Sequence, residues 1–128
     1  MQRKRFERLV DNAVATIPRK FRDALQNLAI VVEDEPPDDV LEELEIGPDD
    51  TLFGLYQGTP LTERTSQYGN TLPDRISLYQ GPIEDECETD DEIVQCIGET
   101  LIHELGHYFG LSEEEIEDIE EKYWRGEG

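Results

Sequence analysis

The chain is poor in the residues from which many metal and redox sites are built. Its 128 residues include two histidines, two cysteines and one methionine. With no third histidine, a metal site with three histidine ligands is excluded, so a histidine-based site must take its remaining ligand from a carboxylate or a thiolate. The two cysteines, Cys87 and Cys96, are expected to be free thiols in an ordinary cytosol, where disulfides are rare. A disulfide between them, which is plausible only in an unusual host, would pin the loop that contains Cys87 to the helix expected around Cys96.

Positive charge is also scarce. Eleven Lys and Arg residues stand against 32 Asp and Glu residues, which gives a formal net charge of −21. Because phosphate backbones are bound by clustered cations, this balance argues against nucleic acid as a partner, and a basic peptide fits better. A dense acidic surface is equally typical of a highly soluble or thermally stable protein without any ligand. The first eight residues, MQRKRFER, hold four of the basic side chains, and we expect these to dock on the acidic remainder.

Long apolar runs are absent as well. No stretch of the sequence approaches the length that spans a membrane, and no apolar segment follows the basic start. We therefore expect no membrane association and a cytoplasmic location. The length predicts one domain over residues 1–128, large enough for a core but too small for two lobes around a cleft.

Both histidines lie in one segment, HELGHYFGLSE, which covers residues 103–113. On a helix, side chains four residues apart share a face, so His103 and His107 can bind one metal ion. Glu104 lies beside them and is placed to act as the general base toward a metal-activated water. Cys96 lies two turns earlier, roughly 10 Å along the axis, which is too far for the same ion. The spacing therefore predicts a catalytic zinc helix.

Helix signals frame this segment. Thr89 and Glu92 have the spacing of a capping box, which predicts a helix start, and Gly110 predicts the helix end. Apolar residues such as Ile97 and Leu101 repeat at helical spacing on the face that carries the ligands. The ligands are therefore expected to be partly buried.

The third protein ligand is expected just after the turn at Gly110. A second capping box begins at Ser112, so another helix is expected to start at about Glu113. Glu113 is the first acidic side chain after the turn, although acidic residues favour a first helical turn with or without a metal. Glu117 lies one turn further along the same face and is the principal competitor, whereas Asp118 is rotated away.

The segment HELGHYFGLSE resembles the HExxHxxGxxD motif of the zincin metallopeptidases, in the small single-domain bacterial group called mini-zincins, with glutamate in place of the aspartate. The segments FERLVDNAVATIP, LFGLYQGTPL and LPDRISLYQGPI also resemble that group, so nearly the whole chain is covered. The resemblance implies Zn²⁺ as the cofactor, His103 and His107 as ligands, and Glu104 as the base. It puts Glu113 at the position of the final ligand, where the longer glutamate arm must fold back to reach the same metal position.

The same resemblance implies an α+β fold of the zincin type. In it a small mixed β-sheet packs against an N-terminal helix and the HExxH helix, a C-terminal helix follows, and substrate lies extended along an edge strand. Met1 is the only methionine, so no methionine turn can lie beneath the zinc as it does in metzincins. Tyr123 or Trp124 is expected to occupy that supporting position instead.

The rest of the chain carries signals for further elements. Apolar residues from Phe6 to Ile17 keep helical spacing, which predicts a first helix that covers the sheet and is interrupted near Pro18, with a short continuation. Strands are expected over residues 28–33, 52–57 and 75–80, and a small acidic helix near residues 40–44. The second and third strands are expected to pair or to neighbour each other.

Two connections stand out between these elements. The one from Gly58 to Asp74 is long for a compact domain, and we expect it to border the cleft. Arg64 and Tyr68 in this connection could reach substrate or an oxyanion, but pairing of the arginine with a carboxylate and packing of the tyrosine on the loop are the favoured explanations. The segment 84–92 is acidic enough to be mobile.

The sequence thus predicts a zinc-dependent metallopeptidase that hydrolyses a peptide or protein substrate with a zinc-activated water and Glu104 as general base. The alternative is a non-catalytic protein that keeps the zincin fold and uses its cleft or edge strand to hold a peptide partner. Metal content and chelator-sensitive cleavage of unstructured peptides distinguish the two.

Overall fold

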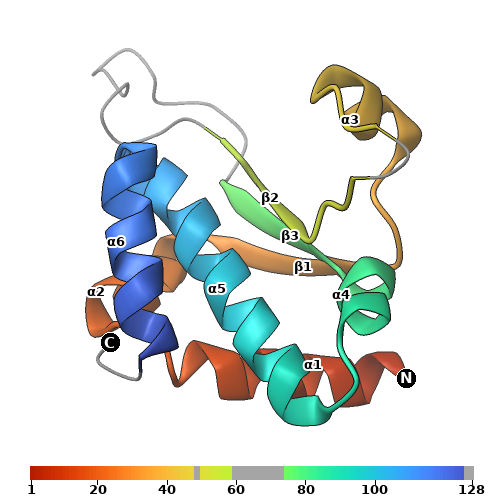
Figure 1. Ribbon diagram of the computed structural model, residues 1–128, viewed down its shortest axis with the longest axis horizontal. Coiled ribbons are helices and arrows are strands. Elements are labelled where there is room, and N and C mark those ends of the chain that lie inside the picture. Colours follow the sequence, from red (N-terminus) through yellow and green to blue (C-terminus); the bar gives the residue numbers. More distant parts are fainter. Residues whose placement is uncertain (48–49, 59–73, 126–128) are drawn as a thin grey trace.

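Helices and strands are interspersed along the part of the chain that the structure describes. A computed structural model describes residues 1–47, 50–58 and 74–125 (Figure 1). Its elements are α1 (Arg3–Val14), α2 (Arg19–Ala24), the 3₁₀ turn η1 (Leu25–Asn27), β1 (Ala29–Glu33), α3 (Asp38–Glu43), β2 (Gly54–Gln57), β3 (Arg75–Tyr79), α4 (Gln80–Glu86), α5 (Asp90–Phe109) and α6 (Glu113–Trp124). The α+β class expected from the sequence is confirmed. None of the helices in these ranges is both long and apolar enough to cross a membrane.

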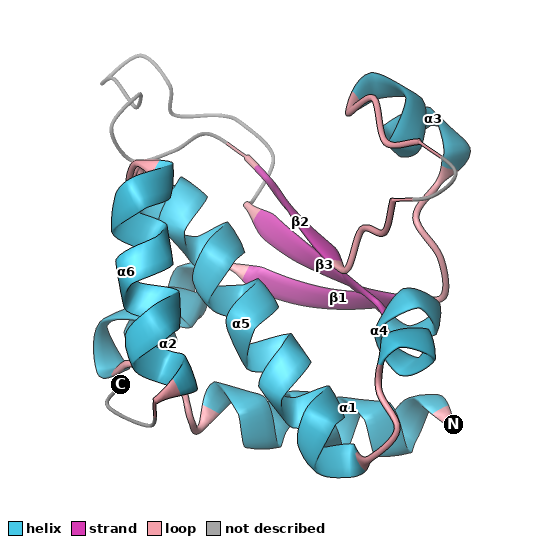
Figure 2. Ribbon diagram, in the orientation of Figure 1, coloured by secondary structure: helices cyan, strands magenta, loops and turns pink. Residues whose placement is uncertain are grey.

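The strands form a small mixed sheet in the order β1-β3-β2 (Figure 2). β1 is parallel to the central strand β3, and β2 is antiparallel to it, with Gly54 opposite Leu78 and Tyr56 opposite Ile76. The expected pairing of the second and third strands is therefore confirmed, although β2 begins at Gly54 rather than at Leu52. β1 and β2 are the two edges of the described sheet.

The first helix packs across α5, which is its main contact in the fold (Figure 1). α1 buries Phe6, Leu9, Val10 and Ala13, whose spacing places them on one helical face. Pro18 precedes α2 as its N-cap, so the interruption and short continuation expected there are confirmed. The apolar stripe of α1 thus covers α5 more than it covers the strands.

The basic start of the chain docks on acidic residues, as expected. Arg3 forms an ion pair with Asp34, and Arg5 pairs with Asp90 at 2.6 Å. Arg3 also donates from Nη1 to the backbone oxygen of Val32 at 2.7 Å, at the edge of β1. Exposed ion pairs contribute little stability on their own, so the edge contact is the more informative of these.

Sequence reasoning missed α4. The segment expected to be mobile contains the end of this helix and the start of α5, which begins at Asp90. Pro82 lies in the first turn of α4, where a backbone N–H is not needed, and the side chain of Ile83 is fully buried. The buried side chains of Gln80 and Ile83 hold this short helix against the rest of the fold.

The two cysteines are free and half-buried. Burial raises the pKa of both thiols, that of Cys96 to about 12. Because the thiolate is the form that binds metal and attacks electrophiles, these cysteines are poor ligands and poor nucleophiles at neutral pH. This agrees with the distance argument against Cys96 as a zinc ligand.

Helices α5 and α6 pack at close range because α5 carries glycines where α6 crosses it. A Cβ on Gly106 would lie 2.5 Å from Cγ1 of Ile116, and one on Gly98 would lie 2.0 Å from the Tyr123 hydroxyl. Ile116 is fully buried, and Tyr123 is 7% exposed. The glycines therefore set the distance between the two helices.

This packing predicts that Gly106→Ala lowers the free energy of unfolding by about 1–3 kcal/mol, because the new methyl group overlaps a stiff β-branched side chain. In an Ile116→Ala background the same change should instead be neutral or stabilising by up to about 1 kcal/mol, since alanine has the better helix propensity. Urea denaturation of the four proteins measures the cycle. Equal effects of Gly106→Ala in both backgrounds would contradict this account.

Candidate metal and catalytic site

The helix that carries both histidines is defined at each end by local sequence. At its start the Thr89 side chain accepts from the backbone N–H of Glu92 at 3.1 Å, which is half of the expected capping box. At its end Gly110 has φ 75°, in the left-handed region that favours glycine. The N–H of Leu111 donates to the carbonyl of Gly106, and that of Gly110 to His107, which together form a Schellman motif.

This turn sends α6 back along α5 in the opposite direction (Figure 1). Ser112 caps α6 with a complete capping box, because its hydroxyl accepts from the N–H of Glu115 while the Glu115 carboxylate accepts from the N–H of Ser112, both at 3.1 Å. α6 begins at Glu113, as predicted. Its first residues are therefore held beside the last turn of α5.

The two histidines and Glu113 converge. Nε2 of His107 lies 3.5 Å from Oε1 of Glu113, and Nε2 of His103 lies 3.8 Å from Oε2 of the same carboxylate. The histidine side chains are 36% and 40% exposed, so they are reachable from solvent yet partly buried, as expected. Two imidazole nitrogens and one carboxylate are a donor set that zinc accepts with a fourth position open, so these residues fit the metal.

Glu120 holds His103 from the other side of the ring. Its Oε1 lies 2.8 Å from Nδ1 of His103. A neutral His103 that donates from Nδ1 to this carboxylate keeps the lone pair of Nε2, the atom that faces Glu113, available for a metal. Glu120 is therefore a positioning residue for the ligand ring.

Glu104 lies beside the histidines and reaches the edge of the sheet. One ligand atom of each of His103, Glu104 and His107 lies within 4.8 Å of the others. The backbone N–H of Tyr56 in β2 donates to Oε1 of Glu104 at 2.7 Å. Burial raises the pKa of Glu104 while this hydrogen bond and the two imidazoles oppose the rise. A carboxyl group with increased proton affinity is suited to accept a proton from water.

The strand β2 turns part of its backbone toward this site. The N–H of Tyr79 donates to the carbonyl of Phe53 at 2.9 Å, so Phe53 faces β3. Residues of an antiparallel strand alternate in direction, and Gly54 and Tyr56 therefore point their backbone groups away from β3 toward the free edge. The bond from Tyr56 to Glu104 lies on this outer edge.

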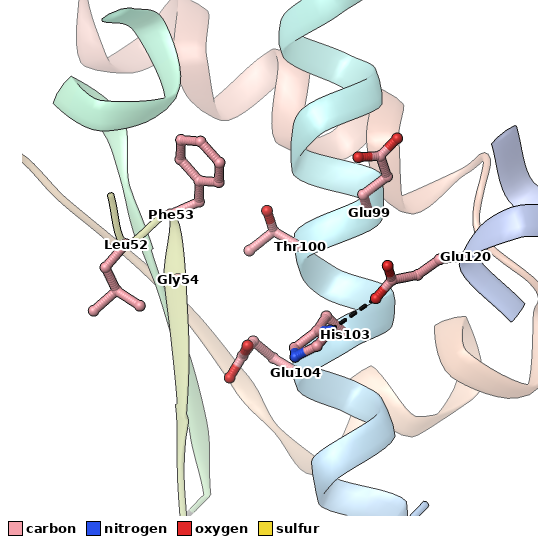
Figure 3. Close-up of a pocket in the computed structure, with 8 residues that line it drawn as sticks. All are labelled: Leu52, Phe53, Gly54, Glu99, Thr100, His103, Glu104 and Glu120. Atoms are coloured by element: carbon pink, nitrogen blue, oxygen red, sulfur yellow. Dashed lines mark hydrogen bonds and ion pairs between the residues drawn. The ribbon is translucent and has the colours of Figure 1, made fainter. Parts of the chain in front are cut away.

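A cavity of about 280 Å³ opens next to Glu104, between β2, α5 and α6 (Figure 3). Its lining residues are Leu52, Phe53, Gly54, Glu99, Thr100, His103, Glu104 and Glu120. Figure 3 shows the carboxylate of Glu104 directed toward the strand and that of Glu120 directed toward His103. The cavity is thus continuous with the residues that would bind metal and move protons.

The structure separates the candidates for the third ligand. Residues of α6 that contact α5 include Glu113, Ile116, Glu120 and Tyr123, which follow a spacing of three and four. Glu117 is exposed and lies beside this stripe, and in the described part of the chain no ion pair joins it to either histidine. The arrangement favours Glu113.

Tyr123 and Trp124 are the residues expected to support the metal from beneath, and their described surroundings lie elsewhere. Tyr123 packs against Gly98, five residues before His103, and its hydroxyl lies 2.8 Å from the hydroxyl of Thr16. Trp124 is 64% exposed. Tyr123 therefore ties α6 to α5 and to the end of α1 instead, because the antiparallel course of α6 carries its last turn away from the site. Arg64 and Tyr68 lie outside the described residues.

The sequence profile of the zincin-like metallopeptidases matches residues 25–123, most of the chain. The match spans β1, the edge strand β2, the helix of the two histidines and nearly all of α6.

The chain belongs to the zincin-like metallopeptidase family. The resemblance read from the sequence is thus confirmed, and so is the zincin type of α+β fold. No curated protein matches the chain.

Two contributors to this zincin-like site escaped sequence reasoning. Glu120 lies seven residues after Glu113, a spacing that returns to the same face of a helix, and this signal could have found it. The Tyr56 N–H carries no such signal, because a backbone donor is defined by strand position and not by residue type.

The contact with Glu120 predicts that Glu120→Ala weakens zinc binding by about 10–100-fold, because His103 loses the partner that orients its ring. Glu120→Gln should recover part of the affinity, since the amide oxygen still accepts from Nδ1. Competition with a zinc chelator measures both, with Glu121→Ala, an exposed change on the adjacent residue, as the control. Wild-type affinity in Glu120→Ala would show that the contact does not support the metal.

Proposed function

We propose that this zincin-like protein is a zinc-dependent peptidase whose site consists of His103, His107, Glu113 and Glu104. The observation that carries the proposal is the convergence of both histidine Nε2 atoms on the Glu113 carboxylate, with Glu104 held beside them at a strand edge. Family membership makes hydrolysis of a peptide bond the expected chemistry.

Each residue takes one role. His103, His107 and Glu113 would hold the ion, with Glu120 orienting His103. Zinc, when bound, supplies a Lewis acid that acidifies a water and polarises a carbonyl. Glu104 accepts the proton of the attacking water and returns it to the leaving amine. Its hydrogen bond from Tyr56 fixes the carboxylate at the side of the cleft where a peptide would lie.

The substrate is an extended peptide along the outer edge of β2. Gly54 directs its backbone donor and acceptor away from β3, and such an edge can pair with an added strand. An extended peptide in this place passes over α5 at Thr100 and Glu104, so a peptide carbonyl comes next to the base. No described contact favours the alternative of a partner-holding scaffold without catalysis.

Two substitutions distinguish the role of the general base from the role of the metal ligands. Glu104→Gln should retain zinc but lower the rate of peptide hydrolysis by at least about 100-fold, because the amide cannot take a proton from water. His103→Ala should lose both zinc and activity. Metal analysis of the purified proteins and a chelator-controlled peptide cleavage assay provide the two readouts, and full activity in Glu104→Gln would refute the base role.

The third ligand is tested by a matched pair on α6. Glu113→Gln should weaken zinc binding by more than the roughly 10–100-fold cost of losing a supporting partner, because a ligand itself is lost. Glu117→Gln removes the same charge one turn later and should leave zinc affinity unchanged. The reverse order of effects, measured by chelator competition, would assign the ligand to Glu117.

A further inference from the structure

The cavity beside Glu104 has one wall that is apolar and one that is acidic. The lining residues of the apolar wall are Leu52, Phe53 and Thr100. Those of the acidic wall are Glu99 from α5 and Glu120 from α6 (Figure 3). The described residues that line it include no Lys or Arg. A group that enters this cavity meets carbon along its length and negative charge at the carboxylates.

The edge of β2 determines which part of a bound peptide enters. In an antiparallel pair, residues directly opposite each other place their side chains on the same face of the sheet. A Cβ on Gly54 would lie 2.7 Å from Cγ2 of Thr100, so that face is the one toward α5. A peptide residue opposite Gly54 therefore directs its side chain into the cavity, where Gly54 itself has none.

We propose that this cavity is a specificity site for a lysine or arginine side chain next to the scissile bond, with Glu99 as the residue that selects it. This rests on the proposed peptidase function and names its substrate class. Ligand pockets for whole small molecules span roughly 300–1,000 Å³, so a cavity of about 280 Å³ suits a single long side chain.

The chemistry of the walls favours a basic side chain over the alternatives. Its methylene groups can lie along Leu52, Phe53 and Thr100 while the cationic head reaches the carboxylates. An acidic side chain would be repelled. An apolar side chain would fill the space but leave the carboxylates without a cation, which costs free energy in a partly buried place.

Glu99 carries an incompletely balanced charge. Its described partner is the side-chain amide of Gln95, which donates to Oε1 at 3.0 Å. Burial, followed by the nearby negative charge of Glu120, raises the pKa of Glu99, and the Gln95 hydrogen bond offsets only part of this rise. One oxygen of Glu120 already binds His103, so Glu99 is the carboxylate more available to a substrate cation.

The test uses peptides that differ only at the residue opposite Gly54, with Lys, the uncharged isostere norleucine, or Glu. A zinc-loaded wild-type protein should cleave the Lys peptide at least about tenfold better in kcat/KM than the norleucine peptide. Glu99→Gln should remove most of this ratio, chiefly because cleavage of the Lys peptide falls, and Glu99→Lys should reverse it in favour of the Glu peptide.

A matched control separates the local contact from the general acidity of the protein. Glu92 lies on the same helix two turns earlier and is exposed, so Glu92→Gln removes the same charge outside the cavity. It should leave the Lys to norleucine ratio intact. Equal ratios in Glu99→Gln and Glu92→Gln, or no Lys preference in the wild type, would overturn the proposal.

A binding measurement keeps the two proposals apart. Fluorescence anisotropy with labelled versions of the same peptides on zinc-loaded Glu104→Gln protein gives dissociation constants without cleavage. A Lys preference in binding that depends on Glu99, with no cleavage by wild type, would support the specificity site and refute the peptidase. Cleavage without any Lys preference would refute the specificity site and leave the peptidase standing.

Discussion

The antiparallel return of α6 along α5 is the constraint on which the rest of the site depends. The two histidines by themselves are one turn of an amphipathic helix, and each further acidic group that faces them from α6 arrives only because that helix is turned back. Gly110 makes the turn in a left-handed conformation, and Gly106 lets Ile116 approach closely enough to fix the crossing. Glu113 and Glu120 then meet the imidazoles from two directions.

A feature of the site could be predicted from the sequence where it depends only on residues that are neighbours in the chain. The start of α5, its end at Gly110 and the start of α6 at Glu113 each depend on a few neighbouring residues, so they could be predicted from the sequence. Glu120 depends on the crossing of two helices, and the place of Tyr123 depends on the same crossing. The antiparallel course of α6 carries Tyr123 to Gly98 and Thr16, and no local pattern in the sequence contains that direction.

The sheet shows the same division between local and distant information. The strands themselves were recognised from short branched and aromatic runs, and the pairing of β2 with β3 was expected. Which N–H groups of β2 face outward depends on its register with β3, whose paired residues lie 18 to 24 positions away in the sequence, so the hydrogen bond from Tyr56 to Glu104 could not be predicted from the sequence. α4 was missed because one buried isoleucine replaces a periodic pattern.

At the two edges of the described sheet, side chains of opposite charge bind the outward backbone groups. At β1 the outward carbonyl of Val32 is occupied by Arg3, a long charged side chain that discourages pairing with another chain. At β2 the outward N–H of Tyr56 is bound by Glu104. That hydrogen bond also links Glu104 to an element far from it in sequence. A chain that has formed the helix of the two histidines but has not docked β2 lacks this anchor for Glu104, so the activity proposed for the site depends on the sheet edge as much as on the helix.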